Sequence, residues 1–290
     1  EGETLSDYLP AGTAFGLRSY DEATGTLTVD NGLFADAYTT NAYAVHNMAL
    51  VVVEHPAHSF TLNSNGKYVC ACGYVCKHPG MNAATGNCSD CEKLLAAASV
   101  KASDGTTSYY ADIKAAFNAA KVSGGTLTLL QNVTLDEGGA IYINPYEDDY
   151  AGEYNFTIDW NGRTLSGNHY SLLLSFSGRT NVTMKDSSGS NTGGVRNTYT
   201  VADLTGGTAV YISIENGCCV TIESGFYSAR VWKCECSGDL KISGGVFENP
   251  QKATVGYALL SSGRDTTDVG KLADLLVGGC TFAYSADGTN

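Results

Sequence analysis

The chain has 290 residues, of which 43% are hydrophobic and 16% are charged, and this composition supports a folded core and excludes a disordered chain. Its 30 acidic and 17 basic residues give a formal net charge of −13, which would repel a phosphate backbone, so we expect no nucleic-acid partner. The longest apolar run, residues 48–53, is far shorter than the roughly 20 residues that cross a bilayer, so we expect no membrane span.

Residues 1–54 are expected to form a small β-rich module or cap. Residues 26–29 alternate polar and apolar side chains, and residues 49–53 form an apolar run with the length of a buried strand. The sequence starts at Glu1 with neither a Met nor an apolar leader, and its high Gly, Thr and Tyr content is typical of exported surface proteins. We therefore expect a segment of a larger protein that is extracellular or located at the cell surface.

Histidines and cysteines gather within residues 55–97, which we assign to a metal-held module and its linker. The second half of this cluster has the spacing Cys-x-His, nine residues, Cys-x-x-Cys, and it offers four ligands: Cys76, His78, Cys88 and Cys91. The first half has the same order of His before Cys and offers a second set: His55, His58, Cys70 and Cys72. Four such nitrogen and sulfur ligands are typical of closed, structural zinc sites.

Disulfides in a secreted domain, or redox chemistry, are the alternatives to zinc for this cluster. The ten cysteines fall into two groups of five, and an odd number in each half would leave a thiol over if disulfides were confined to either half. Metal ligation has no such requirement, so it is favoured. A catalytic zinc would keep an open position, and neither set offers a poised Glu beside a His-x-x-x-His pair, so we expect the zinc to be structural rather than catalytic.

The same residues resemble a known kind of module. The motifs His58-Ser-Phe60, Cys70-Ala-Cys72-Gly73-Tyr74-Val75-Cys76-Lys77-His78 and Cys88-Ser-Asp-Cys91 are similar to the short zinc-ribbon repeats of large surface proteins from gut Firmicutes. The chain departs from their Cys-x-x-Cys pattern at Cys70-Ala-Cys72, where one residue fewer separates the thiols. The resemblance implies a zinc-ribbon-like module in a bacterial cell-surface protein.

The clearest helix of the sequence spans residues 109–121. Its apolar residues recur at i, i+3, i+4 and i+7, namely Ile113, Ala116, Phe117 and Ala120. Ser108 is the expected N-cap, and Gly124-Gly125 ends the pattern. Because strands follow directly, we expect the helix to cover the open apolar end of a β-solenoid, although a helix of an ordinary βαβ unit is the alternative.

Five later segments share one template, in which apolar and polar residues alternate and Gly follows: residues 156–162, 182–189, 220–225, 240–245 and 275–279. The intervals from Ile158 to Met184 and from Ile222 to Ile242 both fall within the periods that are typical of solenoid coils. The interval from Met184 to Ile222 is longer, and it suggests an extra coil at residues 208–214.

These repeats predict the fold class as all-β, with a right-handed parallel β-helix over residues 98–290 and the 109–121 helix as its N-terminal cap. The zinc-ribbon-like module and the short β-rich segment precede it. The repeats resemble the β-helical domains of the same gut bacterial surface proteins. This is a likeness of fold, and a fold by itself implies no activity.

Enzymes that cleave polysaccharides on this scaffold use carboxylate pairs and basic side chains on one face. The residues that could serve are Asp159, Asp186, Glu223, Lys185, Arg163, Arg179, Lys241 and His169. We expect Asp159 and Asp186 to accept backbone N–H groups in turns instead, and His169 to be a solvated turn residue. No catalytic residue is therefore assigned.

Two further features have several interpretations. Residues 144–150 form an acidic, aromatic insertion that could be a solvated loop, a calcium site or a set of tyrosines that stack on sugar. The cysteines of the second half, Cys218, Cys219, Cys234 and Cys236 with Cys280, could be buried free thiols, disulfides between coils or metal ligands.

Together these features predict a noncatalytic adhesion or binding protein that presents a β-helix face to a glycan or a host surface protein. The alternatives are a carbohydrate-active enzyme, either a polysaccharide lyase or a glycoside hydrolase, and a purely structural stalk. An adhesin would show an exposed face rich in tyrosine, whereas an enzyme would show acidic or basic side chains that converge in a groove.

Overall fold

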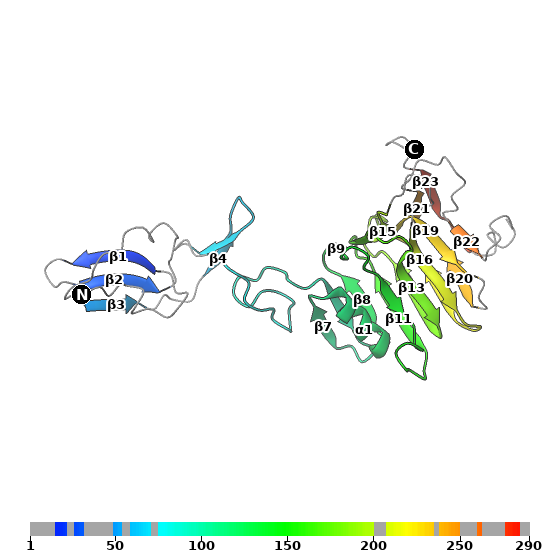
Figure 1. Cartoon of the computed structure of the whole chain (residues 1–290), viewed down its shortest axis with the longest axis horizontal. Helices are drawn as coiled ribbons and strands as arrows, with labels where there is room; N and C mark the ends of the chain where they lie inside the picture. Colours follow the sequence, from blue (N-terminus) through cyan, green and yellow to red (C-terminus); the bar gives the residue numbers. More distant parts are fainter. Residues whose placement is uncertain are drawn as a thin grey trace. The chain divides into compact units, whose positions relative to one another are not determined.

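The computed structural model describes residues 15–21, 26–31, 49–53, 59–70, 75–199, 207–234, 238–249, 260–262 and 276–284. The chain divides into two compact units. One unit contains Glu1–Asn82 with Asn87–Leu94, and the other contains Ala83–Gly86 with Leu95–Asn290. Figure 1 labels strands of both units and the helix α1 of the second unit.

The first unit is built of short strands. A three-stranded sheet contains β1 (Phe15–Asp21), β2 (Thr26–Asn31) and β3 (Ala49–Val53), with β1 antiparallel and β3 parallel to β2. A hairpin follows, in which β4 (Phe60–Leu62) and β5 (Tyr68–Cys70) are antiparallel. The two strands predicted within residues 1–54 are confirmed as β2 and β3.

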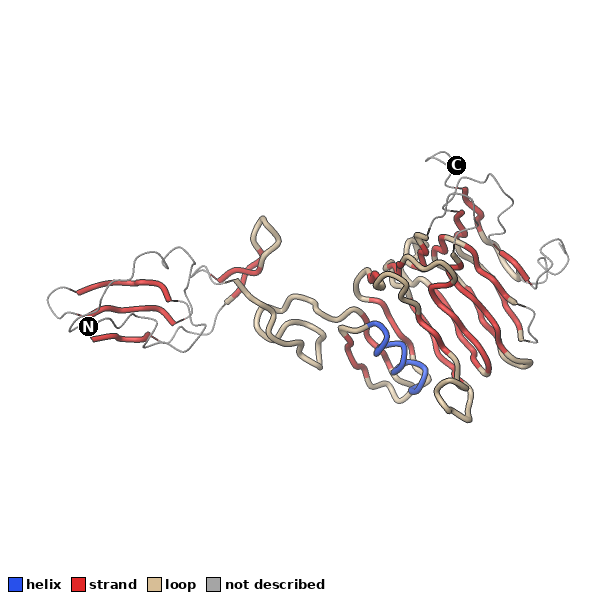
Figure 2. Tube along the Cα trace, in the orientation of Figure 1, coloured by secondary structure: helices blue, strands red, loops and turns tan. Residues whose placement is uncertain are grey.

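The second unit is mostly β and contains three sheets of parallel strands (Figure 2). Sheet 1 contains β8 (Thr126–Leu129), β11 (Tyr154–Asp159), β14 (Thr180–Lys185), β17 (Cys219–Ile222) and β20 (Asp239–Ile242). Sheet 2 contains β9 (Val133–Thr134), β12 (Thr164–Gly167), β15 (Gly194–Asn197), β18 (Phe226–Ser228), β21 (Val246–Asn249) and β23 (Thr281–Tyr284). Sheet 3 contains β10 (Ile141–Ile143), β13 (Leu172–Gly178), β16 (Thr208–Ile214), β19 (Arg230–Lys233) and β22 (Leu260–Ser262).

From β8 to β22 the chain visits sheets 1, 2 and 3 in a fixed rotation, and each strand pairs in parallel with the strand one turn of this rotation away. This arrangement is compatible with a β-helix. Ile158, Met184, Ile222 and Ile242 stand side by side in sheet 1, as the repeated template predicts. All four are buried.

The extra coil predicted at residues 208–214 is wrong. These residues do form a strand, β16, but it belongs to sheet 3. Met184 pairs directly with Ile222, so the whole interval between them makes one long coil. The added length lies in the connections on either side of β15 rather than in a further turn of the chain.

The core of this unit follows from the two-residue period of its strands, because alternate side chains point inward. In sheet 3 the inward positions Leu174, Val210 and Val231 lie in register and are fully buried. The inward column of sheet 2 is aromatic toward its later strands, where Tyr227 and Phe247 are stacked with ring centroids 5.3 Å apart. Apolar columns of this kind make one continuous core along the stack.

The predicted helix is α1 (Ile113–Ser123), and its buried face consists of the predicted apolar residues together with Lys121. Its N-cap is Asp112, whose carboxylate accepts a hydrogen bond from the Lys114 N–H at 2.8 Å. The prediction of Ser108 as N-cap is wrong, since Ser108 lies in a strand. Gly124 ends the helix in the left-handed conformation with a φ of 65°.

The end of sheet 1 is covered by a hairpin that was not predicted. It consists of β6 (Ala98–Lys101) and β7 (Thr107–Tyr110), and β6 pairs antiparallel with β8. The residues leading up to position 98 were expected to be a linker, and no strand was predicted there. A strand serves here because the edge of β8 has backbone N–H and C=O groups that only another backbone can pair in series. The helix α1 packs beside the hairpin and adds apolar cover (Figure 1).

Candidate metal centre and surface sites

The candidate metal centre is built from two chain segments of the first unit. Cys76 follows β5, and its N–H donates to the Tyr68 carbonyl at 2.9 Å, which turns the chain back on the hairpin. In the second segment the Cys88 N–H donates to the Lys93 carbonyl at 2.7 Å, and the Glu92 N–H donates to the Cys88 carbonyl at 3.2 Å. The Cys88-x-x-Cys91 motif is thereby closed into a tight turn.

The structure brings together all four residues of the second predicted set. One ligand atom from each of Cys76, His78, Cys88 and Cys91 lies within 4.8 Å of all the others. The three cysteines are buried and His78 is half-buried. The Sγ atoms of Cys76 and Cys88 are 3.8 Å apart, and the Cys91 Sγ lies 3.1 Å from the His78 Nδ1.

The separation of the Cys76 and Cys88 sulfur atoms fits a shared metal ion. Sulfur ligands at about 2.3 Å from one ion, at tetrahedral angles, lie about 3.8 Å from each other. A disulfide would bring two sulfur atoms to about 2.05 Å, and Cys76, Cys88 and Cys91 are all free thiols. The donor set of three sulfurs and one imidazole therefore could bind a metal ion.

The thiols of this cluster differ in acidity. Burial raises the pKa of Cys76 to about 11, and the neighbouring thiols of Cys91 and Cys88 add to this effect. Burial alone would also raise the pKa of Cys88. The backbone N–H groups of Asp90 and Cys91, together with the His78 side chain, outweigh burial there and lower the pKa of Cys88 to about 6. One thiolate is thus stabilised in place before any cation arrives.

Of the first predicted set, the structure describes only Cys70. The other three residues, His55, His58 and Cys72, lie outside the described part of the chain. Cys70 is buried at the end of β5. The prediction that these four residues complete a second site stays a prediction.

The two aspartates considered for catalysis are occupied by backbone donors, as expected. The buried Asp186 carboxylate accepts N–H bonds from Gly162 at 2.7 Å, Ser188 at 3.1 Å and Gly193 at 2.8 Å. Asp159 accepts from Asn161 and Ser187, both at 3.0 Å. Each carboxylate therefore ties one coil to the next instead of facing a substrate.

The expectation that His169 is solvated is wrong. Its side chain is only 7% exposed, and its Nδ1 accepts the N–H groups of Ser171 at 3.0 Å and Leu172 at 3.1 Å. The side-chain amide of the buried Asn197 accepts the His169 N–H and donates to the His169 carbonyl. The imidazole caps the start of β13. The remaining candidates lie on the surface as exposed or half-buried residues: Arg163, Arg179, Lys185, Glu223 and Lys241.

Two shallow grooves lie on the described surface of the second unit. The first has a volume of about 350 Å³ and is lined by hydroxyl groups, backbone and one carboxylate, Glu137. The second has a volume of about 370 Å³ and is lined by Asn155, Asn181, threonines and Cys219, with no carboxylate. Neither groove brings together the pair of acids that glycoside hydrolysis requires.

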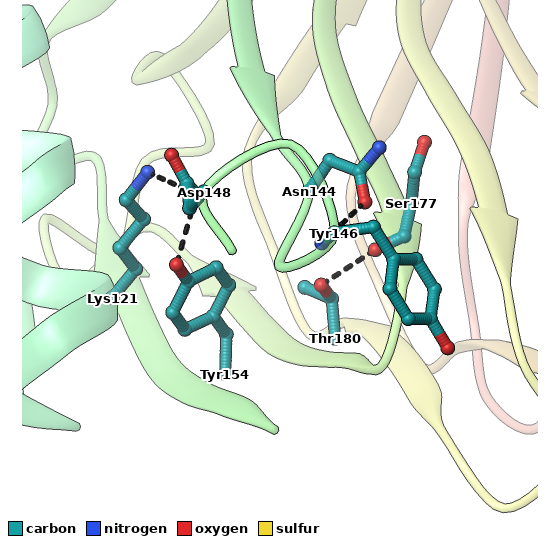
Figure 3. Close-up of polar contacts among 7 residues, drawn as sticks. All are labelled: Lys121, Asn144, Tyr146, Asp148, Tyr154, Ser177 and Thr180. Atoms are coloured by element: carbon teal, nitrogen blue, oxygen red, sulfur yellow. Dashed lines mark hydrogen bonds and ion pairs between the residues drawn. The ribbon is translucent and has the colours of Figure 1, made fainter. Parts of the chain in front are cut away.

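The insertion of residues 144–150 is held against the coils (Figure 3). Asp148 forms an ion pair with the Lys121 ammonium at 2.6 Å and accepts the Tyr154 hydroxyl at 2.9 Å. Tyr150 stacks on Tyr154 with centroids 4.9 Å apart, and the Tyr146 hydroxyl donates to Glu215. Because Asp148 already holds an ammonium group, the calcium interpretation is not favoured.

Sheet 3 presents an aromatic column on its outward side, a feature that the sequence analysis missed. Tyr142, Ser175, Tyr211 and Trp232 occupy the same register position on four successive strands. The Tyr142 side chain is 52% exposed. The Tyr211 and Trp232 rings meet edge to face with centroids 5.2 Å apart, and the Arg230 guanidinium lies 4.5 Å from the Trp232 centroid. We call Tyr142, Tyr211 and Trp232 the aromatic column.

The cysteines of the second half are free thiols where the structure describes them. Cys218 is buried, whereas Cys219, Cys234 and Cys280 are half-buried. Cys236 lies outside the described residues. The interpretation as free thiols is therefore supported for these four.

Comparisons of the chain with known protein families, with curated proteins and with solved structures find no match in any of the three. Among the helices in the described part of the chain, none combines the length and the apolar character needed to cross a membrane.

Proposed function

We propose that this chain is a segment of an extracellular or cell-surface protein that binds a glycan without cleaving it. The binding element is a right-handed parallel β-helix over residues 98–290, and a zinc-ribbon-like module precedes it. The resemblance to surface proteins of gut Firmicutes supports this assignment. The observation that carries it is the aromatic column on sheet 3.

The aromatic column suits a sugar chain because of its spacing and its exposure. Neighbouring strands of a sheet lie about 4.8 Å apart. Tyr211 and Trp232 lie on adjacent strands, whereas Tyr142 lies two strands from Tyr211 with the buried Ser175 between them, so the three rings form an interrupted apolar strip on a rigid support. Aromatic rings present large apolar faces with little conformational entropy to lose, and the C–H faces of sugar rings are apolar. The serine hydroxyls beside the strip, Ser177 and Ser213, add polar contacts on the same outward side.

The carboxylates support binding over cleavage. Asp159 and Asp186 use their oxygens to accept backbone N–H groups. A hydrolase needs one protonated and one free carboxylate on either side of the bond that it cleaves. Neither aspartate is arranged for either role, so a carbohydrate-active enzyme is the weaker alternative.

We further propose that the ion at Cys76, His78, Cys88 and Cys91 is zinc, and that it is structural. Three thiolates and one imidazole are ligands that zinc prefers, and a set of four protein ligands leaves no open position for substrate. Residues 75–94 contribute only short bridges and turns. Such a segment has too little apolar core to fold alone, and metal binding would supply the missing free energy.

The test is a glycan-array measurement on the full chain, combined with an assay for released reducing sugar. We expect binding to at least one glycan with no sugar release. Tyr142→Ala and Trp232→Ala should each weaken binding about tenfold or more, as for buried aromatic anchors. Tyr170→Ala is the matched control, because Tyr170 is 72% exposed and lies before β13, outside the aromatic column.

Three outcomes would overturn parts of this proposal. Equal loss of binding in the Tyr170 variant would remove the aromatic column as the site. Release of reducing sugar would establish a carbohydrate-active enzyme. If the chain binds no glycan but binds a host surface protein, it is an adhesin for protein. If it binds neither, it is a structural stalk.

A further inference from the structure

The metal centre also places two thiols opposite each other from different chain segments. Cys76 and Cys88 are 5% and 2% exposed, and their Sγ atoms are 3.8 Å apart. The third thiol, Cys91, is engaged by the His78 imidazole at 3.1 Å. The Cys91 thiol also lies within 4.8 Å of both. We take Cys76 and Cys88 as the pair because their sulfur atoms are in contact at 3.8 Å and come from different chain segments.

This approach is fixed by the backbone on both sides. Cys76 is held through its N–H bond to Tyr68, beside the bridge between Val69 and Val75. Cys88 is held by the bridge to Met81 and by its N–H bond to Lys93. Bringing the two sulfur atoms to the bonding distance of a disulfide requires side-chain rotation and a small backbone shift rather than refolding.

We propose that Cys76 and Cys88 form a redox site, in which a hydroperoxide converts the two thiols to a disulfide and thereby expels the metal ion. This inference rests on the proposed metal site. One thiolate attacks a peroxide oxygen and breaks the O–O bond, which gives a sulfenic acid and hydroxide. The other thiol then displaces the hydroxyl group as the S–S bond forms. The two sulfurs lose two electrons and two protons, and hydrogen peroxide becomes two molecules of water.

The disulfide removes two of the four ligands at once. His78 and Cys91 remain, and a single thiolate and one imidazole do not make the closed tetrahedral site that holds zinc tightly. The new covalent bond spans the same two segments that the ion had joined, because the cysteines are 12 positions apart. The module therefore has two closed forms, one reduced with metal and one oxidised without it.

The experiment uses the full chain loaded with zinc and titrated with hydrogen peroxide. Released zinc is followed with a chromogenic indicator, and disulfides are mapped by alkylation and peptide mass spectrometry without reduction. We expect zinc release from this site to rise in step with a Cys76–Cys88 linked peptide. A thiol reductant with added zinc should reverse both changes.

Cys91→Ser keeps the reacting pair and should still form the linked peptide, whereas Cys88→Ser should not. If all three thiols stay reduced while zinc is retained, or if Cys88 joins Cys91 instead, the redox site is wrong. A wild-type chain that never holds metal, yet forms the Cys76–Cys88 linkage, would overturn the metal proposal and leave the thiol pair. The metal proposal and the redox proposal can therefore fail separately. Zinc release and the linked peptide in the wild-type chain test the redox site even if a variant does not fold.

Discussion

Asp186 shows how a single carboxylate joins adjacent coils. It sits at the end of β14 and receives N–H groups from its own turn and from Gly162 on the preceding coil. Burial alone would raise its pKa, but these N–H donors, led by Gly193, outweigh burial and hold the pKa of Asp186 below its usual range. The ionised form is therefore the one that the fold stabilises.

Asp186→Asn should lower the free energy of unfolding by about 1–3 kcal/mol at neutral pH, because an amide can accept at only one of its two ends and leaves a buried N–H unpaired. Since the folded pKa is depressed, the advantage of the wild type is complete above the usual aspartate value of about 4. It should disappear as the pH falls through the folded pKa. Urea unfolding of both proteins at several pH values measures this difference.

The control for this prediction is Asp239→Asn, because Asp239 is exposed at the start of β20. The free energy of unfolding of this variant should differ from that of the wild type by less than about 0.5 kcal/mol. An Asp186 variant that matched this control, or one whose deficit grew as the pH fell, would show that the carboxylate does not bind the coils together.

At the scale of elements, the helix α1 stabilises the stack through one face. Phe117 is 1% exposed and belongs to the continuous core. Phe117→Ala should cost about 3–5 kcal/mol, the usual effect of removing a buried aromatic side chain. Val122 lies on the same helix and is 76% exposed. Val122→Ala should therefore change the free energy of unfolding by less than about 0.5 kcal/mol.

Thermal unfolding followed by circular dichroism compares the two helix variants. Equal midpoints would mean that α1 rests loosely on the coils and contributes no core. A large loss in the Val122 variant alone would show that the opposite face of the helix is the packed one.

Local patterns predicted the elements whose signals lie within a few residues. The face of α1 follows from the helical period of its apolar residues, and the column from Ile158 to Ile242 follows from alternation repeated at solenoid spacing. Likewise, Cys76, His78, Cys88 and Cys91 were predicted from ligand spacing alone. The order of these residues along the chain is enough to specify a set of four donors.

Features that depend on distant partners were missed. The β6–β7 hairpin forms because the edge of β8 needs a partner strand. No pattern within residues 98–110 indicates that need. His169 is buried, and its backbone N–H and C=O are bonded by the Asn197 amide of the next coil. The aromatic column requires the register of strands that are far apart in the sequence, and each of its members occupies an ordinary outward position of its own strand.

At the scale of the whole molecule, we expect residues 75–94 to depend on the proposed metal ion and the second unit to depend on its apolar core. The continuous core runs from Ala98 to Phe247 and contains none of the metal ligands. Chelation of the ion should therefore raise hydrogen exchange in peptides that cover residues 75–94 and leave the strands of sheets 1 to 3 protected. Hydrogen-exchange mass spectrometry with and without a chelator checks this, and equal loss of protection in both regions would contradict it.

We propose that one metal ion, rather than disulfides, closes the module around Cys76, His78, Cys88 and Cys91. Native mass spectrometry of the full chain, purified under reducing conditions without added metal, tests it most directly. We expect the mass of a chain with zinc bound, and one ion fewer in Cys88→Ala than in the wild type. A wild-type chain of metal-free mass, or a Cys88→Ala chain that keeps every ion, would contradict it.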